Sequence, residues 1–490
     1  RTSTLENNNQ KANRLAVSGL YTLSNSQDPL ISSNFYNKQK VYSAFSSAQI
    51  GFRRYAYLNL TARNDWSSTL PAANRSYFYP SVNASFILSE AFDLQNDVLT
   101  YAKVRGGWSK VGKDATPYQL LNTYDFTAPF DNNPQQSLNA TELNPDLKPE
   151  TTKSTEVGLE LGLFDNRIRL DFGLYNTNSV NQILGLDVSP ATGFSRKLVN
   201  GGTINNKGLE TMLSVTPVKT ADFTWDIDIN YSRNRSEVKS LYQDVQSYVL
   251  GTSGTVQVLA TVGKPYGSLF GTAFERNAAG DIIVEADGTP AISPTKKILG
   301  KYTPDWLGGI TNSFRYKDFN LSVLVDAHVG GQIFSGTNNT GTYTGVLAAT
   351  LPGRGAENGG ITYTAANGST RDDGIIFQGV LADGTTNTTI LPAESYYKAI
   401  TNADEAFVYS ATYVKLREIK LGYNLPAQWI KTLGMKSATV SLVGRNLLMI
   451  HKDVPNIDPE TAFNTGNGQG LEDLGLPSVR TIGFNLNFKF

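Results

Sequence analysis

The sequence predicts an all-β protein: a transmembrane antiparallel β-barrel, of which this chain supplies about thirteen strands. Two observations predict this class. Apolar and polar side chains alternate along segments of about ten residues, the length of a tilted strand that crosses a bilayer. The connections between these segments then alternate between short and long, which is typical of barrels in the outer membrane.

The alternation is clearest in two segments. In 225–232, apolar residues take every second position between Asp, Asn and Ser, and in 481–490 they do so between Thr, Gly, Asn and Lys. Because successive side chains of a strand point to opposite faces, each segment has one apolar and one polar face. We predict strands near 40–50, 54–64, 77–89, 98–110, 153–163, 167–177, 207–217, 223–235, 304–316, 319–329, 410–425, 436–447 and 479–490.

The connections give the orientation. The long ones are 65–76, 111–152, 178–206, 236–303, 330–409 and 448–478, and all others are short. In an outer-membrane barrel the short turns face the periplasm and the long loops face outside. A soluble β-sandwich gives no reason for such strict alternation.

Strand order indicates that further strands come before this chain. The last strand follows a long loop and runs toward the periplasm, and counting back, the first predicted strand does too. Residues 1–39, rich in Asn, Ser and Gln and without alternation, are expected to form the extracellular loop before it, and 40–490 the C-terminal part of the barrel. Single-chain barrels have an even strand number, so upstream strands are expected: about nine in a barrel of roughly 22, the size of a plugged transporter.

Composition agrees with a barrel and excludes several other classes. Aromatic residues, which favour strands and membrane interfaces, make up 11% of the chain. Lys+Arg and Asp+Glu balance at 43 each, so no excess of positive charge indicates a nucleic-acid partner. The chain has no cysteine, which excludes disulfides and thiolate metal sites.

Eight short stretches resemble the SusC/RagA family of TonB-dependent outer-membrane receptors. In chain order they are 63–68 (RNDWSS), 79–92 (YPSVNASFILSEAF), 144–150 (NPDLKPE), 206–210 (NKGLE), 303–312 (TPDWLGGITN), 413–426 (YVKLREIKLGYNLP), 444–447 (GRNL) and 457–460 (IDPE). Pro149 departs from the family pattern, which has Trp there. The resemblance covers the C-terminal half of such a receptor, and the plug domain and TonB-contacting segment of the family are expected upstream.

The resemblance implies a function and partners. Such receptors import oligosaccharides or peptides across the outer membrane, powered through TonB, and pair with a SusD-like surface lipoprotein that closes over the barrel. A second hypothesis is a barrel of the same family that serves as a structural or assembly scaffold for surface lipoproteins. A siderophore or cobalamin receptor is a third, against which 303–312 and 413–426 argue. An enzyme is not expected, because no Ser, His and Asp set converges on the polar faces.

Loop 330–409 holds the candidate contact residues for a ligand or for the lid. At roughly 80 residues it far exceeds ordinary connections. Aromatic rings stack on sugars or peptides, and charged groups fix orientation, although packing between loops would use the same side chains. The candidates are Tyr343, Tyr363, Arg371, Asp372, Tyr396 and Tyr397. A short helix is expected near 393–404, with Pro392 at its start.

The last strand looks like the C-terminal signal that the barrel-assembly machinery recognises, with Phe484, Phe488 and Phe490 on its apolar face. Phe488 and Phe490, with other aromatic residues such as Trp225 and Tyr231, are also expected to lie at the headgroup level of outer-membrane lipids.

The remaining polar candidates are expected to be structural. Asp226 and Asp228 are expected to line the lumen beside Arg169 and Arg233 rather than act in catalysis. The two histidines, His328 and His451, are expected to be solvated at loop bases. No cofactor is expected.

Three acidic stretches carry carboxylates of the kind that bind Ca²⁺. The stretch with Asp281, Glu285 and Asp287-Gly288 is expected to form a hairpin turn rather than an EF-hand. Ca²⁺ binding stays open for 371–374 and for Asp453 with 458–460, because carboxylate oxygens are ligands that Ca²⁺ prefers.

Overall fold

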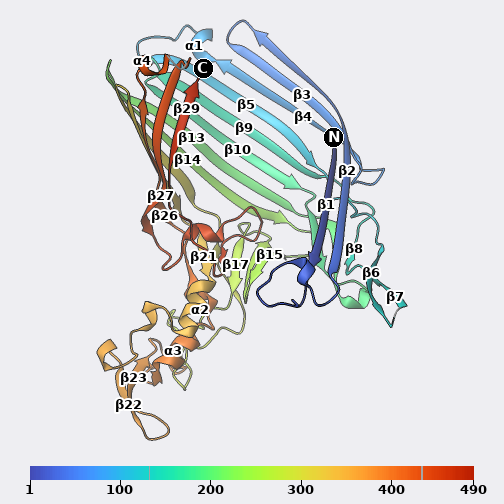
Figure 1. The fold of residues 1–490 in the computed structure, drawn as a ribbon, viewed down its shortest axis with the longest axis vertical. Coiled ribbons are helices and arrows are strands. Elements are labelled where there is room, and N and C mark those ends of the chain that lie inside the picture. Colours follow the sequence, from blue (N-terminus) through green and yellow to red (C-terminus); the bar gives the residue numbers. More distant parts are fainter. Residues whose placement is uncertain (132, 432–433) are drawn as a thin grey trace.

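The computed structural model describes residues 1–131, 133–431 and 434–490, and one curved antiparallel sheet of 14 strands dominates it (Figure 1). Each strand pairs with its neighbours in chain order. The strands of this sheet are β1 (Thr2–Lys11), β2 (Ile31–Phe52), β3 (Ala56–Ser67), β4 (Ser76–Ile87), β5 (Leu99–Lys113), β9 (Glu150–Leu163), β10 (Ile168–Val180), β13 (Thr203–Lys219), β14 (Phe223–Ser240), β19 (Trp306–Tyr316), β20 (Phe319–Val329), β26 (Tyr413–Asn424), β27 (Ser437–Lys452) and β29 (Thr481–Lys489).

Every predicted strand lies in this sheet in the predicted order, and β1 is the strand that was not predicted. The expected loop over 1–39 is therefore wrong at both ends. Thr2–Lys11 pairs with Ile31–Lys40, and only 12–30, with a short 3-10 helix η1 (Leu23–Asn25), connects them. All ten residues of β1 are exposed and most are polar, so no alternation marks the strand; its backbone pairing with β2 defines it.

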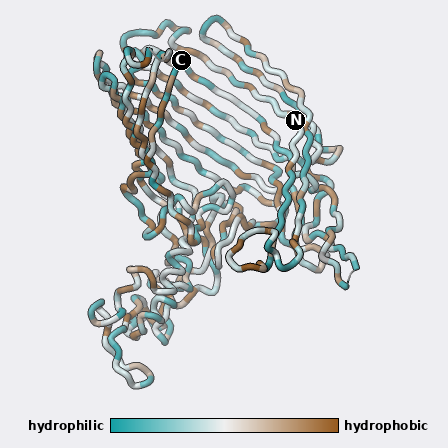
Figure 2. Tube along the Cα trace, viewed as in Figure 1, coloured by the Kyte–Doolittle hydropathy of each residue, from teal (hydrophilic) through white to brown (hydrophobic). Residues whose placement is uncertain are grey.

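The register sorts apolar and polar residues onto opposite faces. Cross-strand partners share a face, and one apolar row runs over six neighbouring strands, consisting of Trp225, Phe314, Leu321, Leu421, Leu442 and Phe484. The next row holds Asp226, Ser313, Ser322 and Lys420. Figure 2 shows the same alternation of teal and brown along the strands. We call the face with Asp226 and Lys420 the inner face and the face with Trp225 the outer face.

The connections lie at the two ends of the sheet as predicted. Short turns, with the one-turn helices α1 (Leu88–Ala91) and α4 (Ala427–Ile430), lie at the end drawn at the top of Figure 1. The long loops lie at the other end and fold into small sheets and helices. None of the helices in the described residues is long and apolar enough to cross a bilayer.

The elements of the long loops are β6 (Tyr124–Phe130), β7 (Asn133–Leu138), β8 (Thr141–Glu142), β11 (Ile183–Asp187), η2 (Pro190–Thr192), β12 (Arg196–Asn200), β15 (Ser247–Ser253), β16 (Val256–Thr261), β17 (Ser268–Gly271), β18 (Lys297–Lys301), β21 (Gln332–Ser335), α2 (Gly336–Thr344), η3 (Ala348–Thr350), η4 (Ala356–Asn358), β22 (Ile361–Thr364), β23 (Thr370–Ile376), β24 (Ile390–Pro392), α3 (Ala393–Ile400), η5 (Asp404–Phe407), β25 (Val408–Ser410), η7 (Pro459–Ala462) and β28 (Leu471–Glu472). The helix α3 confirms the one expected after Pro392.

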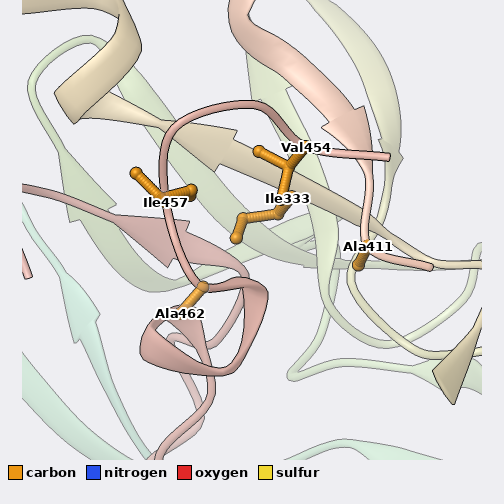
Figure 3. Close-up of a cluster of buried hydrophobic side chains, with 5 residues drawn as sticks. All are labelled: Ile333, Ala411, Val454, Ile457 and Ala462. Carbon is orange, nitrogen blue, oxygen red and sulfur yellow. The ribbon is translucent and has the colours of Figure 1, made fainter. Parts of the chain in front are cut away.

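The hydrophobic cores lie in the loops and not inside the sheet. One core joins the loop after β20 to the loop after β27 through Ile333, Ala411, Val454, Ile457 and Ala462 (Figure 3). Others join further loops to one another. This distribution fits a barrel, whose apolar side chains face outward and whose inner face is polar.

The outer face is expected to contact lipid, and Val323, near the middle of β20, tests this. Val323→Arg should lower the free energy of unfolding in vesicles by about 2–4 kcal/mol, because it places a charge at the bilayer midplane. Ser322→Arg, on the inner face, should have little effect. Urea titrations of folded protein in lipid vesicles measure both values, and equal losses would show that the faces are wrongly assigned.

Candidate functional site

The inner face carries ion pairs that join neighbouring strands. Lys103 on β5 lies 3.0 Å from Glu160 on β9, measured Nζ to Oε1. Arg105 bridges two strands, since its guanidinium lies 2.7 Å from Glu160 and 2.7 Å from Asp171 on β10. Lys103, Arg105, Asp171 and Tyr175 border a hollow of about 490 Å³. The inner face of the sheet is therefore a polar, charged wall rather than an apolar core.

A second polar cluster lies where β3 meets the long loops, and it explains the stretch RNDWSS. Asp65 is buried, at 5% exposure, and accepts hydrogen bonds from Arg63 at 2.8 and 3.1 Å. The Tyr79 hydroxyl on β4 also donates to Asp65. Ser67 donates to Asp114, in the loop after β5, at 2.5 Å. The stretch thus fixes two adjacent strands and the loop beside them.

A third cluster, which we call the loop clamp, consists of Lys415, Arg417, Asp326, Asp458 and Glu460. Lys415, which is 2% exposed, lies 2.8 Å from Asp458 and 2.5 Å from Glu460. Arg417 pairs with Glu460 and, at 2.6 Å, with Asp326 on β20. Two stretches that the sequence shows separately, YVKLRE and IDPE, are therefore partners that tie the loop after β27 to the wall.

The charges of the loop clamp are mutually stabilised. Burial disfavours ionisation of Glu460, but hydrogen bonds from Arg417 and Lys415 outweigh it and lower the pKa of Glu460 to about 2. A carboxylate with a lowered pKa contributes stability that is fully present above its ordinary value and is lost as pH falls through the lowered one. The contribution of Glu460 is therefore expected to be complete above its ordinary pKa of 4.5 and to be lost as pH falls to about 2.

The six predicted contact residues fall into two groups in an extracellular lobe, which we define as α2, α3, β22–β24 and the hairpin 274–292. The first group surrounds the two helices. Tyr343 is 54% exposed, with the Lys398 ammonium 5.4 Å from its ring centroid. Tyr396 packs in the lobe core against Phe377. The Tyr397 hydroxyl donates to the backbone carbonyl of the loop at Pro352.

The second group lies on the β22–β23 hairpin. Tyr363 is opposite Arg371 in the register. Arg371 forms an ion pair with Asp373, whereas Asp372 accepts a hydrogen bond from the Ala356 amide at 3.3 Å. Most of the six side chains therefore make contacts within the lobe. Of the four aromatic candidates, Tyr343 is the one that stays largely exposed.

The acidic stretches are engaged by the protein itself. A hairpin at Asp287-Gly288 is confirmed: Gly288 has a φ of +91°, and Asp287 accepts a hydrogen bond from the Thr289 amide at 2.9 Å. In the other two stretches, Asp373, Asp458 and Glu460 pair with Arg or Lys side chains, as shown above. Within the described residues, no three His, Asp or Glu side chains gather as metal ligands would. Ca²⁺ binding stays a prediction, and Ca²⁺ would have to displace these cations.

The expectation for the histidines is correct for one of them. His451 is exposed and lies 2.9 Å from Asp453. His328 is buried, at 6% exposure, between the rings of Tyr413 and Phe463, so the expectation of a solvated side chain is wrong. The sequence places His328 on the inner face, but it does not show that the loop after β27 folds over that position.

Asp226 and Asp228 lie on the inner face and accept hydrogen bonds from the hydroxyls of Thr216 at 2.6 Å and Ser214 at 2.5 Å. No ion pair joins either carboxylate to Arg169 or Arg233 in the described part of the chain. On β29 the side chains of Phe484 and Phe488 lie on the outer face and are exposed, as is that of Phe490 just after the strand.

Sequence reasoning missed the ion pairs of the inner face and the loop clamp. The signal was present, because Lys103, Arg105, Glu160 and Asp171 all fall on the polar parity of their strands. Choosing partners among them needs the register of three strands.

Glu460→Gln tests the loop clamp. The amide keeps the size of the side chain but removes the carboxylate that Lys415 and Arg417 share, leaving Asp458 and Asp326 as their anionic partners, which should cost about 2 kcal/mol. Hydrogen exchange in 453–480 should become faster while exchange in β9 and β10 stays unchanged. Glu237→Gln, which removes an exposed pair with Lys239, is the matched control. Unchanged exchange in 453–480 would contradict the assigned role of Glu460.

Comparison with known proteins agrees with this architecture. Residues 3–447 match the family described as TonB dependent receptor-like, beta-barrel. TonB-dependent receptor P3 of Formosa agariphila is 28% identical over 94% of this chain and 46% of its own length. TonB-dependent receptor SusC of Bacteroides thetaiotaomicron is 26% identical over 58% of this chain and 31% of its own. The chain spans about half the length of the Formosa relatives that it matches.

A solved structure of the RagAB peptide transporter has the same fold, with a TM-score of 0.72 at 20% identity over 97% of this chain and 50% of that one. Thus the sheet, its polar inner face and the family match agree. The chain belongs to the TonB-dependent receptors of the SusC/RagA type, which are β-barrel proteins of the bacterial outer membrane.

Proposed function

We propose that this chain is the C-terminal barrel part of a receptor that imports oligosaccharides or peptides across the outer membrane, driven through TonB. One observation carries the proposal: the sheet joins an apolar outer face to a charged, polar inner face, as a passage for polar solutes requires. The name of the RagAB peptide transporter supports a peptide as cargo, and the cargo classes that the sequence resemblance implies leave an oligosaccharide equally open. The family consists of transport receptors, so no enzymatic role is proposed.

Further strands of the same polypeptide are proposed to close the barrel. Within the described residues, β1 and β29 each pair with one strand, so each presents an unpaired edge. An unpaired backbone edge is not tolerated in the hydrocarbon region. β1 runs toward the loop end and β29 toward the short-turn end, so antiparallel closure takes an even number of strands. A barrel of roughly 22 strands then needs about eight more, rather than the nine expected when β1 was counted as a loop.

A SusD-like surface lipoprotein is the proposed partner at the loop end. The extracellular lobe projects from the sheet on the side of the long loops (Figure 1). It exposes three apolar side chains close together in the sequence: Tyr343 at 54%, Val346 at 77% and Leu351 at 48%. Exposed apolar groups of this kind mark interaction surfaces. TonB is proposed to act through a segment outside these 490 residues.

The second candidate function is a scaffold for surface lipoproteins. A measurement of transport distinguishes this function from import. In the host bacterium, the full-length receptor should accumulate labelled peptides or oligosaccharides in the periplasm, and deletion of TonB should abolish this. The readout is mass spectrometry of the periplasmic fraction from cells given both mixtures. Assembly of lipoproteins with no TonB-dependent uptake of either mixture would favour the scaffold.

The proposed contact between the extracellular lobe and the SusD-like lipoprotein can be tested in the same cells. Combining Tyr343→Ala, Val346→Ser and Leu351→Ser should reduce co-purification of the lipoprotein, because the apolar contact area is lost. Val17→Ser, Leu20→Ser and Tyr21→Ala change three equally exposed apolar residues of the loop 12–30 and serve as the control. If both triple variants retain the lipoprotein equally, the lobe is not its docking site.

We propose that the barrel-assembly machinery recognises β29. Phe488→Ala with Phe490→Ala should lower the amount of heat-modifiable, folded barrel in outer-membrane fractions, since both rings belong to the proposed signal. Ile31→Ala with Phe35→Ala is the control. It removes exposed apolar groups of β2, which lies near the N-terminal end of the chain, and so tests for general loss of apolar surface. Wild-type abundance of the Phe488 and Phe490 variant would contradict the signal.

A further inference from the structure

The outer face has a hollow of about 550 Å³ beside the short turn that joins β2 to β3. Cross-strand partners share a face, and Val104 and Gly106 alternate with Lys103 and Arg105 of the inner face, so the lining of this hollow faces outward. We call the hollow the outer groove. Its outward-facing lining residues are Ile50, Phe52, Ala56, Leu58, Ala84, Phe86, Val104 and Gly106.

Small residues create the outer groove. Leu58, Ala84 and Gly106 are partners in one row across β3, β4 and β5, and the row continues to Ile50 on one side and Val157 on the other. Ala84 and Gly106 therefore interrupt a row of larger apolar side chains. By contrast, the apolar row over β14 to β29 described above has a large side chain on each of its six strands.

The outer groove suits a hydrocarbon chain better than water. Three polar residues also border it, but Tyr57, Ser85 and Arg105 alternate with the lining residues and belong to the inner face. A bound water needs two to four polar partners, and the outward-facing side chains are all apolar. An acyl chain would instead bury apolar surface on both sides of the contact.

Two arginines lie at the short-turn end of the outer groove. Arg53 directly follows Phe52, and its guanidinium carbon lies 5.5 Å from the centroid of that ring. Arg53 and Arg54 are exposed, and neither forms an ion pair in the part of the chain that the structure describes. The rings of Phe52, Tyr55 and Phe86 make successive edge-to-face contacts, with centroids 5.8 and 5.3 Å apart. Aromatic rings at the end of a barrel lie at the headgroup level, which places both arginines among headgroups.

The carboxylates of the neighbouring turn do not neutralise these arginines. Glu90, Asp93 and Asp97 lie between β4 and β5. Glu90 accepts a hydrogen bond from Gln95 at 2.9 Å, and among the described residues none of the three carboxylates forms an ion pair. The positive charge at the end of the outer groove is therefore available to an anion.

We propose that the outer groove and the two arginines bind one anionic phospholipid from the leaflet at the short-turn end. Its acyl chain lies over Ala84 and Gly106, and its phosphate pairs with the guanidinium groups of Arg53 and Arg54, which match phosphate oxygens in a bidentate geometry. A headgroup with net negative charge, as in phosphatidylglycerol, fits this site, because the ammonium of a zwitterionic headgroup would add a further cation. The lipid fills the outer wall where the two small residues leave a gap, whatever cargo the receptor carries.

The first test removes the charge and measures binding of phosphatidylglycerol. Native mass spectrometry of the purified full-length receptor in detergent gives the fraction of receptors that retain one lipid. Arg53→Gln with Arg54→Gln should weaken binding about tenfold, because each cation near the bilayer surface attracts anionic lipid. Arg167→Gln with Lys317→Gln removes two exposed cations of other short turns and should bind as the wild type. Lys317 is matched to Arg53, since its ammonium lies 5.7 Å from the ring centroid of Tyr316.

The second test fills the outer groove and keeps both arginines. Ala84→Leu with Gly106→Leu should also weaken binding about tenfold, because the acyl chain loses its contact area. A Cβ at Gly106 would lie 3.8 Å from its nearest neighbour, the carbonyl oxygen of Glu156, so the backbone accepts a side chain there. Val323→Leu with Val440→Leu adds apolar bulk to other parts of the outer face and is the control.

Heat-modifiable mobility shows which variants are folded barrels. The arginine pair lies in an exposed turn and decides the question by itself if filling the groove impairs folding. Weaker binding in the test variants with wild-type binding in both controls would support the site. Wild-type binding in a folded test variant, equal losses in the controls, or equal retention of phosphatidylcholine by the wild-type receptor would each overturn it.

Discussion

Pairing of the backbone in a medium without water is the constraint on which the structure depends. In hydrocarbon, each N–H and C=O must find a partner within the protein, and an antiparallel sheet closed on itself meets this demand. The continuous registers from β2 to β29 satisfy it strand by strand. The same demand underlies the proposal of further strands, because β1 and β29 each pair with one strand within the described residues.

Because one face of the sheet meets lipid and the other meets water, the two faces carry different kinds of side chain. Leu442 and Phe484 are opposite each other on the outer face, where exposure is favourable because the neighbour is lipid. On the inner face charge is tolerated, and ion pairs such as that of Arg105 with Asp171 stiffen neighbouring strands. True hydrophobic cores appear where the chain leaves the sheet, as around Ile333, because only the loops must fold as a soluble protein does.

Period-two alternation sufficed to predict the other strands, since most positions that face lipid are apolar. It failed for β1, whose side chains are mostly polar and all exposed and whose backbone pairing with β2 defines it. The loops were predictable only where local chemistry decides, as at Pro392 before α3 and at Asp287-Gly288. The loop clamp was not predictable, because Lys415 meets Asp458 through the fold of a loop and not through any sequence spacing.

The central claim is that alternate residues of these strands touch lipid and water. These 490 residues contain no cysteine, so Val323→Cys or Ser322→Cys gives one site for a nitroxide within them, and any cysteine elsewhere in the full-length receptor is replaced by serine. In vesicles holding the full-length receptor, the label at 323 should collide with dissolved oxygen and the label at 322 with a water-soluble nickel chelate. Equal access of the nickel chelate to both labels would contradict the membrane-spanning assignment.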